Sequence, residues 1–195
     1  RSLYKGQRYV RMRSSKHLIA ELVHMKKEVG TLEYIWFSDD SFFARSLEEI
    51  KEFSALYKEK VALPFFCLGS PLTVTEEKME ALVDAGLNNI QVGLESGSSK
   101  MQALFNRKSM SNDRMLSVAR IVNKYRDRML PPRYDLILDV PYETDEDKVD
   151  TLKLITNIPK PYLLQPFSLV LYPETALYIT ARKDGLIGNE KEEIY

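Results

Sequence analysis

Acidic and hydroxyl side chains follow several apolar stretches of this sequence, at the places where strands would end. These residues are Ser38, Asp39, Asp40, Glu95, Ser96, Asp139, Glu143 and Ser168. Carboxylates and hydroxyls accept hydrogen bonds and attract cations, and parallel α/β folds bind ligands at the carboxyl ends of their strands. Each acid can also be explained as a helix N-cap. The strongest candidates are therefore Asp39, Asp40 and Glu95, which follow the most apolar stretches.

The stretch that ends at Glu95 alternates between polar or small and apolar residues. Gln91, Gly93 and Glu95 fall on one side of a strand, and Val92 and Leu94 fall on the other. This alternation predicts an inner face that binds a polar ligand. Gly93 would let that ligand approach the backbone closely, because glycine has no side chain.

A cation, Arg107, follows the next helical segment and is suited to holding a ligand carboxylate; a solvated surface position is the alternative. Other reactive residue types have ordinary explanations. Cys67 stands alone and is expected to be a buried structural thiol. His17 and His24 are expected on a helix surface, and Trp36 is expected in the core. No serine-histidine-aspartate set, phosphate-binding loop or zinc pattern is present.

Hydrophobic periodicity predicts that helices and strands alternate along the chain. The expected helices are 14–29, 47–60, 75–86, a long helical region that ends before Pro131, 145–157 and 174–183. The expected strands are 33–38, 61–67, 89–94, 134–140 and 163–171. Strands joined through helices run parallel with right-handed crossovers. The first helix is expected to bury Leu18, Leu22, Met25 and Val29.

This order favours an α/β fold, a partial (β/α) barrel of parallel strands. The strands at 34–37 and 61–66 are continuously apolar, as strands covered by helices are, and Pro64 suggests a bulge. No GxGxxG motif supports a dinucleotide-binding sheet. The chain has 195 residues, expected to form a single domain over 1–195, whereas a complete eight-fold barrel needs roughly 250 residues.

The composition is that of an ordinary globular protein. The 28 Lys and Arg residues balance 28 Asp and Glu residues, which gives no strong nucleic-acid signal. No apolar run has the roughly 18 residues of a membrane span, and a single cysteine suits a reducing, cytoplasmic setting. Because the chain starts with Arg1, we expect it to be part of a longer protein.

Four motifs, in this order, resemble the radical SAM superfamily. They are SDDSF at 38–42, QVGLESGS at 91–98, PYETDED at 141–147 and LYPET at 171–175. The chain is most similar to the Fe–S oxidoreductase branch, whose members often carry an upstream cobalamin-binding domain. Residues 4–14 also resemble the segment that follows the cluster loop of that branch.

The resemblance implies a (β/α)6-like barrel whose first strand is missing here. It also implies an enzyme that, when complete, cleaves S-adenosylmethionine reductively at a [4Fe–4S] cluster to a 5′-deoxyadenosyl radical. The implied partners are an unknown substrate and an electron donor such as flavodoxin or ferredoxin, with cobalamin as a further candidate cofactor. The cluster cysteines would lie upstream of Arg1, so this chain alone is expected to bind no metal and to be inactive.

The resemblance also implies roles for individual residues. Ser38, Asp39 and Asp40 match the motif that receives the methionine amino group. Glu95 and Ser96 match the motif that meets the ribose or the methionine carboxylate.

Ile137 matches the position that packs on adenine, and Arg107 is the implied carboxylate partner. With Gln91, Gly93 and Asp139, these residues make up the expected cofactor site. The chain departs from the family at two glycine positions, now Asp139 and Glu174, and a side chain at Asp139 is expected to crowd the adenosine.

Two other functions stay open at this point. Asp40 and Glu95 could serve a barrel hydrolase that uses paired carboxylates, with or without a divalent ion. Alternatively, the chain could be a non-catalytic α/β scaffold whose open barrel edge pairs with another domain.

Overall fold

The structure is a computed structural model that describes residues 12–188. Within this range five strands form one sheet in the order β1-β2-β3-β4-β5, and every neighbouring pair is parallel. The strands are β1 (Ile35–Trp36), β2 (Phe65–Gly69), β3 (Leu87–Glu95), β4 (Arg133–Leu138) and β5 (Leu163–Ser168). The sheet order confirms the predicted parallel α/β fold.

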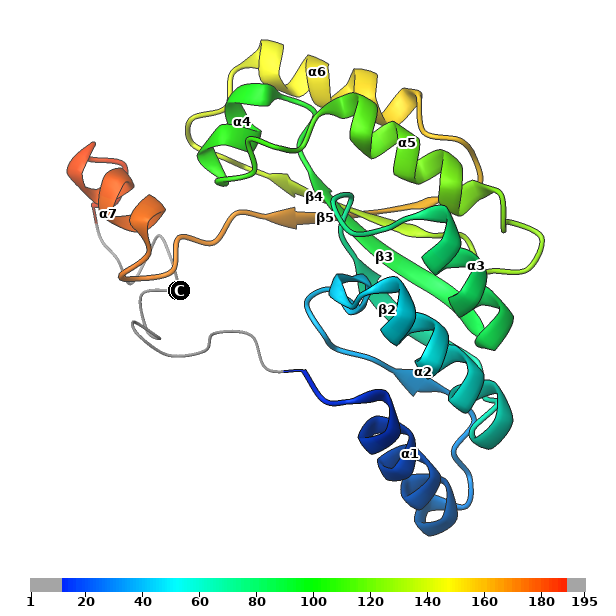
Figure 1. The fold of residues 1–195 in the computed structure, drawn as a ribbon. Coiled ribbons are helices and arrows are strands. Elements are labelled where there is room, and N and C mark those ends of the chain that lie inside the picture. The colour runs from blue at the N-terminus through cyan, green and yellow to red at the C-terminus, as the bar shows by residue number, and fades with distance from the viewer. Residues whose placement is uncertain (1–11, 189–195) are drawn as a thin grey trace.

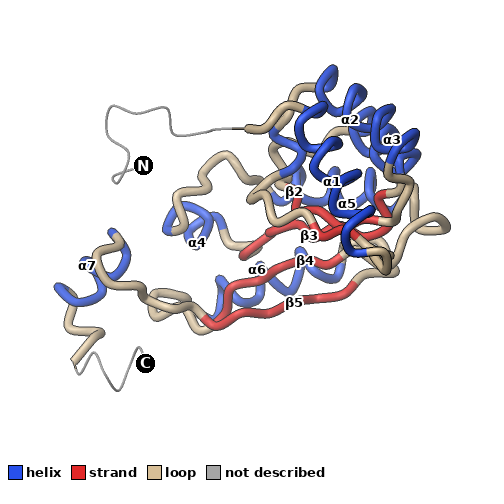
Figure 2. Tube along the Cα trace, turned by 90° about the horizontal axis from the view of Figure 1, so that it is seen from below, coloured by secondary structure: helices blue, strands red, loops and turns tan. Residues whose placement is uncertain are grey.

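Helices connect the strands. They are α1 (Ser15–Val29), the 3₁₀ helix η2 (Phe42–Ala44), α2 (Leu47–Lys60), α3 (Glu76–Ala85), α4 (Ser99–Leu104), α5 (Asn112–Asn123), α6 (Asp145–Thr156) and α7 (Ala176–Lys183). Figure 1 shows α2, α3, α5 and α6 along one side of the sheet. Seen from below, the strands curl into a half-barrel, and no helix of residues 12–188 covers its concave side (Figure 2). The expected partial (β/α) barrel is therefore confirmed.

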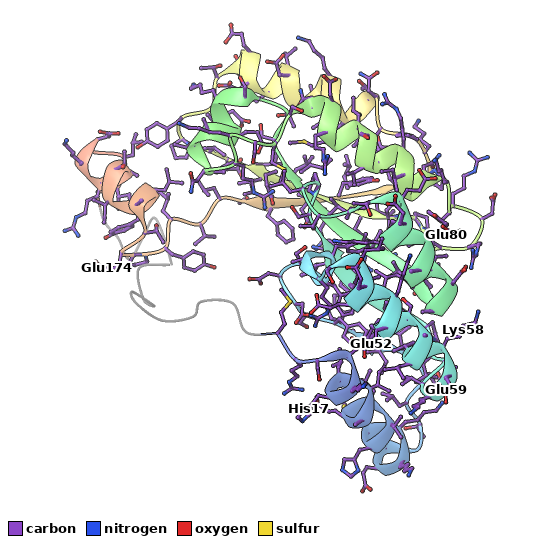
Figure 3. All side chains as sticks on the ribbon, viewed as in Figure 1. His17, Glu52, Lys58, Glu59, Glu80 and Glu174 are labelled. Carbon is purple, nitrogen blue, oxygen red and sulfur yellow. The ribbon has the colours of Figure 1, made fainter. Side chains whose placement is uncertain are left out.

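The core lies between the convex side of the sheet and the helices. Its centre is aromatic, because Phe37 contacts Phe42, Phe53 and Phe65 with ring centroids 5.0 to 5.7 Å apart. All of these rings are buried. The contacts with Phe53 and Phe65 are edge-to-face, and aromatic pairs of this kind add about 0.5–1.5 kcal/mol each to the burial of apolar area. The charged residues Glu52, Lys58 and Glu80 lie on the helix layer (Figure 3).

The prediction that Trp36 belongs to the core is wrong. Trp36 is 55% exposed, whereas its neighbours Ile35 and Phe37 are 6% and 8% exposed. Successive strand residues point to opposite faces, so Trp36 points to the concave side while its neighbours face the helices. An apolar run does not reveal that one face of its strand is uncovered.

The first helix also packs differently from the prediction. Ile19 and Leu22 are buried, while Met25 and Val29 are 41% and 51% exposed. Helix α1 lies at the end of the helix layer, next to α2 (Figure 1). Its last turn contacts the end of α2 through Lys26, which donates to the Val61 carbonyl, while Met25 and Val29 stay exposed.

Other boundaries differ by a few residues from the predictions. The second strand begins after Pro64, so this proline lies outside the strand, and the register shift lies next to it between Phe65 and Phe66. The long helical region is two helices, α4 and α5. They are separated at Asn106, whose backbone is left-handed with φ +58°.

The C-terminal part of the described chain is the least enclosed. Strand β5 pairs only with β4, and both of its faces are mostly exposed. Helix α7 and Glu174 lie on an arm that projects from the half-barrel (Figure 3). The Tyr142 hydroxyl, which follows β4, donates a hydrogen bond to Asp184 after α7 over 2.9 Å. In residues 12–188 no helix has both the length and the apolar character that a membrane crossing requires.

Candidate functional site

The carboxyl edge of the sheet gathers the acids that the sequence singled out. Asp40 follows β1, Glu95 ends β3 and Asp139 follows β4. Because all five strands are parallel, these ends lie along the same edge, which is where α/β folds place their ligands. The predicted placement is confirmed, whereas the roles of the residues in binding stay predictions.

Glu95 and Arg107 form an ion pair at this edge. The shortest distance, from Arg107 Nη2 to Glu95 Oε1, is 2.9 Å, and Nη1 of the same arginine donates to the carbonyl of Gly93 over 3.1 Å. The Glu95 side chain is 13% exposed and that of Arg107 is 32% exposed. The turn after α4 thus brings a fork of N–H donors over the end of β3, where the remaining donors can reach a second carboxylate.

Gly93 provides the space that this ion pair occupies. A Cβ atom at position 93 would lie 2.4 Å from Glu95 Oε1 and 3.5 Å from Arg107 Nη2. Glu95 itself has a left-handed backbone, with φ +69°, which folds its side chain back over Gly93. The close approach predicted for a ligand at Gly93 is made here by the chain's own carboxylate.

The alternation predicted for β3 is confirmed by burial, while ligand binding by its polar side stays a prediction. Gln91, Gly93 and Glu95 are half-buried, and the residues between them are buried. The Gln91 amide nitrogen donates to both carboxylate oxygens of Asp135, over 3.0 and 2.8 Å. Asp135 was not among the predicted site residues. Its position on β4, two residues before Ile137 and on the same face, was the available signal.

Burial raises the pKa of both inner carboxyls above their ordinary values. For Glu95 burial is the largest cause; Arg107 opposes it and the nearby charge of Asp135 adds to it. For Asp135 burial again dominates, opposed by the Gln91 amide and the charges of Arg107 and Arg133. Two acids with raised pKa beside two arginines are typical of a site that binds a polar ligand.

The end of β1 is more open. Ser38, Asp39 and Asp40 are exposed. Arg45 donates to Asp39 over 3.1 Å, and its guanidinium also lies 4.8 Å from the centre of the Phe42 ring. Among the described residues Asp40 has no ion-pair partner, so its carboxylate is available to a ligand amino group.

Ser96 is placed differently from its neighbour Glu95. Ser96 is 1% exposed, and its hydroxyl lies 2.9 Å from the Thr151 hydroxyl and accepts a hydrogen bond from the Ser98 amide. A Cβ at Gly97 would lie 2.5 Å from a backbone oxygen of α6, so the turn sits directly on that helix. The contacts give Ser96 a structural role, and its predicted contact with a cofactor stays a prediction.

Asp147 attaches the same turn to α6. It accepts hydrogen bonds from Ser98 and from the backbone of Thr144, the N-cap residues of α4 and α6, and it is paired with Lys100 over 3.1 Å. These contacts, led by the Ser98 hydroxyl, hold the pKa of Asp147 well below its ordinary value. One carboxylate therefore caps two helices and fixes the turn that presents Glu95.

The end of β4 presents Ile137 and Asp139. Ile137 is half-buried on the concave side, as a residue that packs on a flat ring should be. Asp139 is exposed, and its carboxylate accepts a hydrogen bond from the Ser168 hydroxyl. Its φ of +58° and that of Glu174, +65°, are values that favour glycine. The backbone at both positions thus keeps a conformation typical of glycine, although the side chains are acidic.

The residues of this chain do not fit a [4Fe–4S] cluster. Such clusters are held by several thiolates, and this sequence contains only Cys67. Cys67 is 0% exposed and packs in the core, and burial raises the pKa of its thiol far above the ordinary value. Among the described residues no group of three or more His, Cys, Asp or Glu side chains could hold a metal ion. His17 and His24 are exposed, as predicted.

Comparisons with known proteins agree with this arrangement. A family model described as the radical SAM superfamily matches residues 2–155. The matched range includes the segment at 4–14 that resembles the family. Residues 4–11 of that segment lie outside the described residues. A search of curated proteins gave no match.

Solved structures with a similar fold include several radical SAM enzymes. Coproporphyrinogen III oxidase (HemN) from Escherichia coli shares 16% identity at a TM-score of 0.65, covering 91% of this chain and 42% of that one. The methyltransferase TsrM from Kitasatospora setae, solved with cobalamin and a [4Fe–4S] cluster, shares 15% identity at a TM-score of 0.70, covering 89% and 34%. The cobalamin-dependent enzyme OxsB shares 16% identity at a TM-score of 0.58, covering 93% and 26%. The chain thus spans less than half the length of each.

Proposed function

The chain belongs to the radical SAM superfamily, and from this premise we propose that it forms the S-adenosylmethionine-binding core of a larger radical SAM enzyme. The observation that carries the proposal is the Glu95–Arg107 pair, which the β3 end and the α4 turn bring together at the carboxyl edge of the sheet. Because the chain belongs to this superfamily, we expect it to be part of an enzyme. These residues do not specify the reaction or the substrate.

The residues at the carboxyl edge fit the polar groups of S-adenosylmethionine. The unpaired carboxylate of Asp40, with Ser38 and Asp39, suits the methionine amino group. Arg107 has guanidinium donors to spare for the methionine carboxylate, and Glu95 can accept from a ribose hydroxyl.

The inner face supplies the remaining contacts. Ile137 offers an apolar surface for adenine, and Gln91 orients Asp135 as a second acceptor for ribose hydroxyls. Asp139 and Ser168 close the end of β4 and β5, so a bound adenosine would have to pass the Asp139 side chain. The bound sulfonium would supply the adenosyl group, and the chain would bind and orient it and exclude water.

We further propose that these 195 residues alone make no radical. Cys67 is the only cysteine and lies buried in the core, so cluster ligands must come from another part of the full-length protein. An external electron donor such as flavodoxin or ferredoxin would then reduce that cluster. Cobalamin is a further candidate because TsrM and OxsB bind it. A single buried thiol is consistent with a reducing, cytoplasmic setting.

Calorimetric titration of the 195-residue chain with S-adenosylmethionine tests the binding site. We expect saturable binding that Arg107→Gln weakens about tenfold, since a charge-assisted hydrogen bond contributes about 1.5–3 kcal/mol. The matched control is Arg128→Gln. Arg128 pairs with Asp84 over 2.7 Å at the opposite edge of the sheet and should not affect binding. No saturable binding at about 1 mM ligand, or equal losses in both variants, would contradict the proposal.

A second experiment tests the reaction in the full-length protein. After anaerobic reconstitution with iron and sulfide, a reductant should produce 5′-deoxyadenosine from S-adenosylmethionine. The 195-residue chain treated in the same way should stay colourless and produce none. A full-length protein that forms no cluster would refute the radical function, even if the chain binds S-adenosylmethionine.

A further inference from the structure

An arginine whose side chain makes no hydrogen bond or ion pair with the described residues lies on the concave side of the half-barrel, at the start of β4. Arg133 begins β4, is half-buried and shares its face with Asp135 and Ile137. Among the described residues its guanidinium has no hydrogen bond or ion pair to any group. Asp135, whose pKa burial raises and the charge of Arg133 lowers, accepts its hydrogen bonds from the Gln91 amide at both oxygens instead. The five N–H donors of Arg133 therefore remain available.

An aromatic side chain lies beside this arginine. The Arg133 guanidinium lies 6.0 Å from the centre of the Trp36 ring, across the concave face. Trp36 in turn stacks on Phe66, with ring centroids 3.9 Å apart, and Phe66 is 1% exposed. An aromatic face stabilises a guanidinium while its N–H edge stays open to a ligand. This explains why a strand position that looks like core carries an exposed tryptophan.

We propose that Arg133 and Trp36 form a subsite for an anionic oxygen group, a carboxylate or a phosphate, of the enzyme's substrate. A guanidinium fork matches the two oxygens of either group. The inference rests on the proposed function, in which S-adenosylmethionine binds at the carboxyl edge of the sheet. The substrate would then bind further along the concave side, toward the start of β4.

The position of Arg133 limits the length of the substrate. A parallel strand rises about 3.3 Å per residue, so Arg133 lies about 7 Å below Asp135 and about 13 Å below Ile137 along β4. The reacting carbon must lie near the carboxyl edge while the anion reaches Arg133. Ile137 and Leu138 lie at the carboxyl end of β4, so the expected substrate is an elongated molecule with an anionic end about 13–17 Å from the carbon that reacts.

Trp36 is the only tryptophan of the chain, so its fluorescence reports on this subsite alone. The cofactor-free 195-residue chain is titrated with sodium acetate and with sodium phosphate, each against sodium chloride at constant ionic strength. We expect a saturable fluorescence change with acetate or phosphate and a much smaller one with chloride. The anion that saturates at the lower concentration identifies the group as a carboxylate or a phosphate.

Variants assign the effect to Arg133. Arg133→Gln should weaken anion binding at least tenfold, and Arg133→Lys, which keeps the charge but loses the fork, should reduce the preference over chloride. Arg128→Gln should titrate like the parent chain. Circular dichroism melting checks that each variant folds, and if Arg133→Gln does not, Arg133→Lys decides. The proposal is overturned if the parent chain shows no saturable change, or if the deciding variant titrates unchanged. No S-adenosylmethionine is present, so this outcome is independent of the cofactor titration.

Discussion

Replacing Gly93 with alanine should disrupt the Glu95–Arg107 pair and destabilise the protein by about 1–3 kcal/mol, the usual range for an extra methyl group in a packed site. The added Cβ would lie 2.4 Å from Glu95 Oε1. The carboxylate must then move by about 1 Å to reach an ordinary contact distance. Because Arg107 holds that oxygen at 2.9 Å, the movement costs the ion pair or shifts the arginine. Urea unfolding measures the loss.

A double-mutant cycle isolates the clash from other effects of the methyl group. In the Glu95→Ala background the oxygen that meets the new Cβ is absent, so Gly93→Ala should cost much less there. We expect a coupling energy of about 1–2 kcal/mol between the two positions. Equal destabilisation by Gly93→Ala in both backgrounds would refute the view that Gly93 makes room for the Glu95 carboxylate.

Three further predictions concern pH and backbone strain. Burial raises the pKa of Asp135 above its ordinary 3.8, so its contribution to stability is full below that pH and is lost as pH rises through the folded-state value. Asp135→Asn should therefore flatten this part of the pH profile of urea unfolding, and an unchanged slope would contradict it. The pKa of Asp147 is lowered, so Asp147→Asn should reduce the free energy of unfolding by about 1–3 kcal/mol near neutral pH and by progressively less below pH 3.8. The control is Asp145→Asn, which should have little effect because the Asp145 side chain is 95% exposed. Ala62 has φ +51°, so Ala62→Gly should stabilise the protein by about 0.5–1 kcal/mol in thermal unfolding. Ala55→Gly, inside α2, should destabilise it by a similar amount. A change of the same sign in both variants would exclude a strain effect at Ala62.

The sequence was sufficient to predict the parallel fold and the alternating polarity of β3. Strong local signals explain this success, such as the regular apolar stripe of α2 and the apolar strands between helices. Trp36, Met25 and Val29 were wrongly placed in the core because periodicity shows that a face is apolar but not whether another element covers it. The break between α4 and α5 was missed because the left-handed turn at Asn106 interrupts residues that otherwise suit a helix.

The acids at the carboxyl edge were predictable as a group, but their partners were not. Glu95 and Arg107 were each expected to meet a ligand, and the structure shows that they first meet each other. The position of Asp135 on the same face as Ile137 was predictable, but its hydrogen bonds with Gln91 were not. Such pairings depend on contacts between residues 12 to 44 positions apart, which strand and helix periodicity does not encode.

The enclosed position of Cys67 affects how iron in preparations of this protein should be interpreted. A thiol at 0% exposure cannot reach iron, alkylating reagents or a disulfide partner while the fold is intact. Adventitious iron bound to the native chain would therefore have to be held by oxygen or imidazole ligands. The rate at which a thiol reagent labels Cys67 would instead report how often the core opens, which gives the protein a natural probe of its own unfolding.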